Sequence, residues 1–240
     1  MCNTCGCGLN NISEDHISTG KTVQLTQDIL GQNDRLAGTN RRIFDSMGVV
    51  TVNLVSSPGA GKTTLLERTI RDLKNNIPIG VIEGDQQTDR DAERIRATGV
   101  PAYQIKTMDA CHLDAHMVKH ALENFQMDTL ELLFIENVGN LICPSAFDLG
   151  EDHRVIILSI TEGEDKALKY PGIFLSSQLV ILNKIDLLNV LNFDLDECIS
   201  YINRVNPGVE ILCVSAETGE GMSKWYNWLK QKIDNKRRKK

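Results

Sequence analysis

The feature that most constrains the fold of this chain is a loop of small residues, Ser56-Ser57-Pro58-Gly59-Ala60-Gly61-Lys62-Thr63. An apolar, strand-like run at 52–55 precedes the loop, and a helix-like run beginning at Lys62 follows it. This strand–loop–helix order is the setting of a P-loop, in which backbone N–H groups and a helix N-terminus hold phosphate groups. The loop therefore predicts a nucleotide-binding α/β protein.

Each part of the loop has an expected role. Gly59 and Gly61 let the backbone approach the phosphates. Lys62 would reach the β- and γ-phosphates, and the Thr63 hydroxyl would ligate Mg²⁺. Ser56 replaces the usual first glycine of the motif, which we interpret as a family variation. The expected nucleotide-binding residues of the loop are Ser57, Gly59, Ala60, Gly61, Lys62, Thr63 and Thr64.

Strand-like and helix-like segments alternate along the chain, which favours a mostly parallel sheet sandwiched by helices. Expected strands are 49–55, 79–83, 102–105, 132–136, 154–159, 179–183 and 210–215, and expected helices begin near residues 62, 88, 113, 166, 194 and 221. We expect a Cys-rich head at 1–8 and a linker and N-terminal helix at 9–47, with 9–25 flexible and a helix or broken helix from about 25. A P-loop NTPase (G) domain follows at 48–235 and a basic, frayed tail at 236–240.

A second motif, Asn183-Lys184-Ile185-Asp186, follows the apolar run 179–182. The Asp186 carboxylate would accept hydrogen bonds from guanine N1–H and the exocyclic amine together, an arrangement that adenine cannot offer. The Lys184 stem would lie along the base, and Asn183 would support the loop. The run 215–219, beginning with Ser215 and Ala216, resembles the loop whose backbone meets guanine O6. These motifs indicate GTP as the ligand.

Acidic residues follow two further strands. Glu136-Asn137-Val138-Gly139 lies where GTPases usually carry Asp-x-x-Gly, so Glu136 would bind Mg²⁺ and the Gly139 N–H could sense the γ-phosphate. Asp85 lies in the loop that follows the expected strand 79–83. It is expected to be a metal or water-positioning residue, with a solvated loop acid as the alternative. Lys62, Asp85, Glu136 and Gly139 are the candidate catalytic residues.

Two groups of cysteines indicate transition-metal sites. Cys2, Cys5 and Cys7 place three thiols within six residues, and the amino group of Cys2 would complete an S₃N set suited to Ni²⁺ if Met1 is removed. The alternative is an exposed, oxidisable tail.

The second group is Cys111, His112 and Cys143, which could form a labile nickel or zinc site, alone or shared across a dimer. Cys143 lies seven residues after Glu136, so a nucleotide-dependent shift of that segment would change metal affinity. Alone, a Cys-His dipeptide is usually structural. His112, His116 and His120 recur at helical i, i+4 spacing, which could extend a metal site, but His116 and His120 are interpreted as solvated helix residues. Cys198 and Cys213 are interpreted as packing cysteines.

Composition limits the functions of the chain. Its formal net charge of -6 argues against general binding to nucleic acid or to an anionic membrane. The sequence contains no run of about 18 apolar residues, so no transmembrane helix is expected. The N-terminus lacks a basic region followed by an apolar stretch, so a secretory signal is not expected. We therefore expect a cytoplasmic protein with reduced thiols.

Together these residues resemble the hydrogenase nickel-incorporation GTPases, the HypB family. The resemblance covers nearly the whole chain, and its further markers are the runs 83–89, 111–114, 136–144 and 161–166. It implies a GTP-hydrolysing metallochaperone that loads nickel into the [NiFe]-hydrogenase large subunit with a small zinc-containing maturation partner. It also implies a GTP-linked homodimer with Cys111, His112 and Cys143 near the interface, binding Ni²⁺ or Zn²⁺. Two alternatives stay open, a urease-type nickel GTPase and a nucleotide-gated metal-binding protein.

Overall fold

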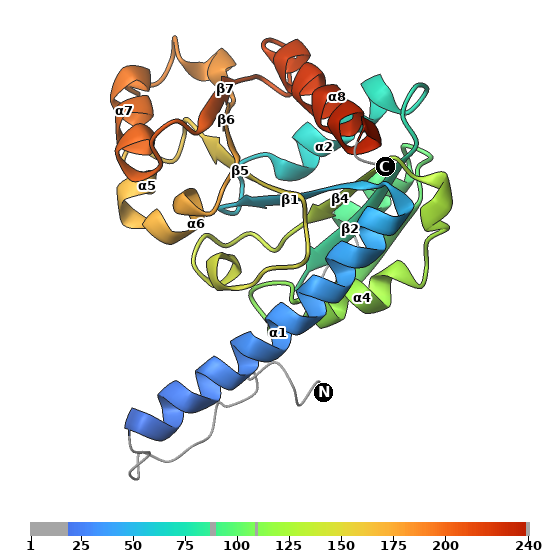
Figure 1. Ribbon diagram of the computed structural model, residues 1–240. Helices are drawn as coiled ribbons and strands as arrows, with labels where there is room; N and C mark the ends of the chain where they lie inside the picture. Colours follow the sequence, from blue (N-terminus) through green and yellow to red (C-terminus); the bar gives the residue numbers. More distant parts are fainter. Residues whose placement is uncertain (1–18, 87–89, 109, 239–240) are drawn as a thin grey trace.

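The computed structural model describes residues 19–86, 90–108 and 110–238, with side chains described from residue 27 and, after the first gap, from residue 91. The described chain forms a parallel sheet of seven strands covered by helices on both faces (Figure 1). The Cys2–Cys7 head lies outside the described residues, so its metal site stays a prediction. The expected α/β fold is confirmed.

The strand order is β3-β2-β4-β1-β5-β6-β7, and every neighbouring pair is parallel. The central strands are buried along their whole length because helices cover both of their faces. All seven expected strands are present. Their bounds are Val50–Ser56 (β1), Ile79–Asp85 (β2), Ala102–Lys106 (β3), Leu132–Glu136 (β4), His153–Ser159 (β5), Leu179–Asn183 (β6) and Glu210–Cys213 (β7).

The helices divide between the two faces. On one face, α2 and α8 pack against β1, β4 and β5 through a cluster that includes Leu66, Phe134 and Trp225. On the other face, α1 and α4 cover β2 and β4, while α5, α6 and α7 cover β5 and β6. The helices are Thr19–Met47 (α1), Lys62–Leu73 (α2), Arg90–Arg96 (α3), Ala115–Leu122 (α4), Lys166–Lys169 (α5), Pro171–Leu175 (α6), Leu195–Val205 (α7) and Met222–Arg238 (α8). Short 3₁₀ turns span Met127–Thr129 (η1), Cys143–Ala146 (η2) and Ile185–Leu187 (η3).

Both ends of the described chain differ from expectation. α1 is one continuous helix from Thr19, so the prediction of a flexible linker is wrong for residues 19–25. A nucleated helix adds residues at little cost, which lets it extend past its apolar anchors. α8 continues to Arg238, and Lys236 forms ion pairs with Asp45 at 2.8 Å and Asp152 at 2.6 Å. Residues 236–238 are therefore not frayed.

Two smaller features position the loops of the sheet. α4 begins at Ala115, two residues later than expected, because the Asp114 carboxylate caps it by accepting from Met117 N–H at 2.7 Å. Leu113 instead packs against Gly84, where a Cβ would lie 2.8 Å from the leucine side chain. Across the described ranges, no helix is both long and apolar enough to cross a bilayer.

Candidate functional site

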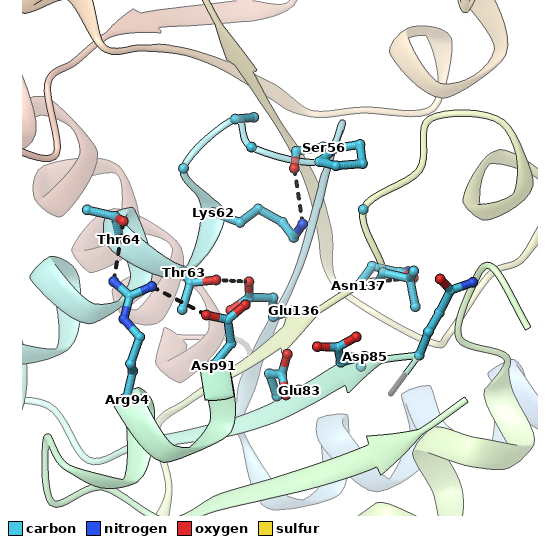
Figure 2. A pocket seen from close by; sticks show the side chains of 18 of the residues that line it. Ser56, Lys62, Thr63, Thr64, Glu83, Asp85, Asp91, Arg94, Glu136 and Asn137 are labelled. Atoms are coloured by element: carbon cyan, nitrogen blue, oxygen red, sulfur yellow. Dashed lines mark hydrogen bonds and ion pairs between the residues drawn. The ribbon is translucent and has the colours of Figure 1, made fainter. Parts of the chain in front are cut away.

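A cavity with a volume of about 520 Å³ lies at the carboxyl ends of β1, β2 and β4. In a parallel sheet these ends meet at one edge, where ligands of open α/β folds bind. Figure 2 shows the P-loop on one side of this pocket and acidic residues on the other. Its lining includes Ser56, Gly59, Ala60, Gly61, Lys62, Thr63, Thr64, Glu83, Asp85, Asp91, Arg94, Glu136, Gly139 and Lys184.

The phosphate loop depends on two glycines in left-handed conformations. Gly59 has φ +77° and Gly61 has φ +91°, a region that L side chains rarely adopt. A Cβ on Gly61 would also lie 2.6 Å from Asn183 Nδ2. Lys62 Nζ donates to Ser56 Oγ at 3.1 Å, so the serine in place of the usual glycine contacts the lysine that is predicted to bind phosphate.

Carboxyl groups form the wall opposite the loop. Thr63 Oγ1 donates to Glu136 Oε1 at 2.7 Å (Figure 2), while Glu136 Oε2 is buried without a hydrogen-bond partner among the described residues. Burial raises the pKa of Glu136, an effect that Lys62 and Thr63 oppose. Two carboxylate oxygens and a hydroxyl are the hard donors that Mg²⁺ prefers. The predicted magnesium ligands Thr63 and Glu136 are thus adjacent and fit the ion.

Glu83 adds a second buried carboxyl group beside Glu136, its register partner on the neighbouring strand. Burial raises the pKa of Glu83 to about 8, with further increases from Glu136, Asp85 and Asp91. Oxygens of Glu83, Asp85 and Asp91 lie within 4.8 Å of one another. Asp85 therefore lines the pocket beside Glu83 and Asp91, while its role as a metal or water-positioning residue stays a prediction.

Two pocket residues on α3 are missing from the sequence interpretation. Arg94 donates to Glu67 at 2.8 Å, to Asp91 at 3.3 Å and to the predicted nucleotide-binding residue Thr64 at 3.4 Å. Mixed charges on a short helix are typical of a solvated face, so the pattern alone gives no reason to assign Asp91 and Arg94 to a site. Their proximity to β2 comes only from the fold.

A smaller cavity of about 180 Å³ lies at the other end of the loop, between the P-loop and the β6–η3 connection. Asn183 joins its walls, since its Nδ2 donates to Ala60 O at 2.9 Å and its Oδ1 accepts from Ala216 N–H at 3.2 Å. Lys184 Nζ donates to Gly59 O at 2.8 Å. Asp186 lines the cavity with a buried Oδ1 that has no hydrogen-bond partner among the described residues. An acceptor of this kind fits the amine of guanine.

Two predicted nucleotide-binding residues do not line either cavity. Ser57 lies in the loop, where its carbonyl accepts from Ser56 Oγ at 2.7 Å. Ser215 is fully buried, and its Oγ accepts from Thr218 N–H at 3.0 Å. Both residues shape the loops rather than the cavity walls.

The predicted metal ligands Cys111, His112 and Cys143 come together in the structure. Cys111 Sγ and Cys143 Sγ lie 2.6 Å apart, and His112 Nδ1 is 3.8 Å from Cys111 Sγ. Burial lowers the pKa of His112, so its imidazole is neutral and able to ligate a metal. Burial, and then contact with Cys143, raises the pKa of Cys111. A metal bound there would displace a thiol proton.

Hydrogen bonds connect this thiol site to the phosphate pocket. Asn137, which follows Glu136, accepts from Leu113 N–H at 3.1 Å and from Val138 N–H at 3.0 Å. Asn140 donates to Cys111 O at 3.3 Å. The 136–140 segment therefore lines the phosphate pocket and also binds the backbone of the thiol site. The sequence alone gives no reason to assign a role to either asparagine.

Known proteins are similar to this chain over most of its length. The family described as CobW/HypB/UreG, nucleotide-binding domain, matches residues 50–213. The hydrogenase maturation factor HypB of Azotobacter vinelandii is 59% identical over 217 residues, covering 90% of this chain and 71% of that protein. The chain belongs to the HypB family.

Solved HypB structures share the fold. The crystal structure of HypB from Archaeoglobus fulgidus is 41% identical with a TM-score of 0.80, covering 85% of this chain and 99% of that chain. HypB from Helicobacter pylori, crystallised in complex with nickel, is 38% identical with a TM-score of 0.81, covering 85% of this chain and 96% of that chain. The family predicted from the motifs is therefore confirmed.

Proposed function

We propose that the protein is a GTP-hydrolysing nickel metallochaperone that assists nickel insertion into the large subunit of [NiFe]-hydrogenase. Membership of the HypB family supports this function, because relatives are hydrogenase maturation factors and one binds nickel in its crystal structure. The observation that carries the proposal is the direct link between two sites. Asn137 and Asn140 tie the segment that lines the phosphate pocket to the backbone of Leu113 and Cys111.

In the nucleotide site, the residues divide between binding and hydrolysis. Asp186 would accept from guanine, while Asn183 and Lys184 hold the base loop against the P-loop. Lys62 would pair with the β- and γ-phosphates. Mg²⁺, held by Thr63 and Glu136 with Asp85 nearby, would neutralise charge on the transferring phosphoryl group.

Gly139 is the residue through which this segment would sense the γ-phosphate. A Cβ at Gly139 would lie 3.2 Å from Pro58 Cα, so the glycine lets the segment approach the P-loop closely. A hydrogen bond from its N–H to the γ-phosphate would exist only before hydrolysis. Loss of the γ-phosphate would then release 136–140, and Asn137 and Asn140 would pass the movement to the thiol site.

Nickel is the proposed cargo of the thiol site. Cys111, His112 and Cys143 supply two thiolates and one imidazole, a set that binds Ni²⁺ or Zn²⁺. Cys111 and Cys143 are half-buried, so a fourth ligand from a second copy of the chain or from a client could reach the ion. Cys2, Cys5 and Cys7 are proposed as a separate nickel site.

The proposed partners follow from this role. They are a second copy of the chain in a GTP-linked homodimer, a small zinc-containing maturation protein and the hydrogenase large subunit. Neither nucleic acid nor a membrane is proposed as a partner, in keeping with the net charge of -6. A cytoplasmic location is proposed, because GTP and reduced thiols are both needed.

The test compares GTP turnover with maturation of hydrogenase. In a strain lacking its own HypB, the chain should restore hydrogenase activity, while Lys62→Ala and Cys111→Ala should each abolish it. Only Lys62→Ala should also abolish phosphate release by the purified protein. Lys230→Ala, at an exposed position, and Cys213→Ala, outside the thiol site, are the matched controls.

Either of two results would overturn the proposal. If Lys62→Ala loses turnover but still supports maturation, the protein is a nucleotide-gated metal-binding protein in which hydrolysis is incidental. If the chain restores urease but not hydrogenase activity, it serves the other nickel enzyme.

A further inference from the structure

The serine at the first position of the phosphate loop makes two side-chain hydrogen bonds. Ser56 is the last residue of β1, so its backbone is extended and does not need the conformational freedom of a glycine. The residue is fully buried, and its hydroxyl donates to Ser57 O at 2.7 Å and accepts from Lys62 Nζ at 3.1 Å (Figure 2). The usual glycine has no side chain and could make neither bond.

We propose that Ser56 is a positioning residue for GTP hydrolysis, which holds the Lys62 ammonium group where it would meet the β- and γ-phosphates. This inference rests on the proposed GTPase function. An ammonium group has three protons to donate. Two of them would go to phosphate oxygens of bound GTP, and the third would stay with Ser56 Oγ. The lysine would then be oriented by the protein as well as by the nucleotide.

The two bonds of the Ser56 hydroxyl depend on each other. Because its single proton is donated to Ser57 O, the oxygen lone pairs are left to accept from Lys62. Burial of Ser56 keeps water from replacing this acceptor. A lysine side chain has many accessible rotamers, and a fixed acceptor at its end reduces their number before any nucleotide arrives. Lys62 is therefore preorganised in the pocket.

The position of this ammonium group should matter more in the transition state than in the bound ground state. A catalytic group displaced by about 1 Å can lower a rate by roughly 100-fold. In the ground state the phosphates attract Lys62 without help from Ser56. Ser56→Ala should therefore lower kcat for GTP hydrolysis by roughly tenfold, the effect of losing one hydrogen bond to a charged group. The affinities for GDP and for a non-hydrolysable GTP analogue should change by less than about threefold.

The experiment measures single-turnover phosphate release and nucleotide affinity in the full chain, for the wild type, Ser56→Ala and Ser56→Gly. Both variants lack the hydroxyl, and the second restores the usual glycine. Ser177→Ala is the matched control and should keep the wild-type rate, because Ser177 is 5% exposed and its Oγ donates to Phe174 O at 2.8 Å, outside the nucleotide site. A wild-type rate in either Ser56 variant would overturn the proposal. A loss of GDP affinity as large as the loss of rate would do the same, since Ser56 would then only shape the loop.

A second measurement does not depend on hydrolysis. The ε-carbon resonance of Lys62 is identified as the one missing from Lys62→Ala, and its relaxation is measured by NMR in nucleotide-free protein. This carbon should be more ordered in the wild type and in Ser177→Ala than in Ser56→Ala. Equal order in the wild type and Ser56→Ala would refute the positioning role. A wild type that shows the ordered signal but releases no phosphate would instead refute the proposed GTPase function.

Discussion

Replacing Asn137 by alanine removes the side chain that joins the phosphate pocket to the thiol site. Asn137 is 1% exposed, and its Oδ1 accepts from the backbone N–H groups of Leu113 and Val138. A buried donor without an acceptor costs about 1–3 kcal/mol, so the substitution should lower the free energy of unfolding by about 2–4 kcal/mol. For a chain of this size that corresponds to a fall in Tm of roughly 5–15 °C.

The substitution should also remove the coupling between the nucleotide site and the thiol site. Coupling between two sites typically amounts to about 1–3 kcal/mol, or roughly 5–150-fold in affinity. We expect nickel affinity at Cys111, His112 and Cys143 to differ by that factor between the GDP and GTP-analogue states. In Asn137→Ala the ratio should approach one while GTP affinity is retained. The assay is nickel titration in each nucleotide state, in a background with Cys2, Cys5 and Cys7 changed to serine.

Asn206→Ala separates coupling from stability. Asn206 Nδ2 donates to Phe174 O at 2.8 Å and to Ser177 O at 3.1 Å, beside α6 and α7. Its removal costs these two hydrogen bonds, and neither of them reaches the nucleotide site or the thiol site. The control should therefore be destabilised and keep the wild-type affinity ratio. A folded Asn137→Ala protein that keeps that ratio would refute the coupling route.

Three further substitutions test other parts of the site. Asp186→Asn should weaken GTP binding by up to about 10⁴-fold and favour xanthosine triphosphate, measured by competition with a fluorescent nucleotide. Gly139→Ala should slow GTP hydrolysis more than it weakens GTP binding, because its Cβ would press on Pro58 at 3.2 Å; unchanged turnover would contradict this. The pKa of Glu83 is raised from 4.5 to about 8, so the folded state binds the extra proton and stability should fall as pH rises through that window. Denaturant unfolding of metal-free protein should show a flatter pH profile for Glu83→Gln than for the wild type.

The sequence predicts those parts of the site that are contiguous along the chain. The P-loop and the 183–186 motif each place their chemistry within a few residues, so their local setting is enough to identify them. The buried strands can be predicted equally well, because short apolar runs between turn residues are compatible with few other structures. Even the thiol site could be proposed, since Cys143 follows Glu136 closely.

Residues whose role depends on distant partners could not be predicted in the same way. Arg94 reaches the pocket only because α3 packs beside α2, and Lys236 is held by carboxylates that lie more than 80 positions away. Asn137 appears in the sequence as an unremarkable position inside a GTPase motif. Its importance comes from Leu113, which is 24 residues earlier in the chain.

The hydrogen bonds around the thiol site also indicate which ligand moves. His112 is held from two sides, because Asn137 binds the adjacent Leu113 backbone and the Phe147 ring packs against the imidazole, with the ring centroids 3.9 Å apart and the planes tilted by 32°. Phe147 is fixed in turn by Arg154, which donates to its carbonyl at 2.9 Å.

Cys143 has weaker restraints. It begins the short η2 turn directly after Ile142, whose side chain is 64% exposed, and it follows the segment that would respond to the γ-phosphate. A shift of that segment would therefore displace Cys143 relative to a fixed Cys111–His112 pair. Moving one of the three ligands changes the coordination of the ion without dismantling the site. A metallochaperone needs this property, because it must bind nickel firmly in one nucleotide state and release it in the other.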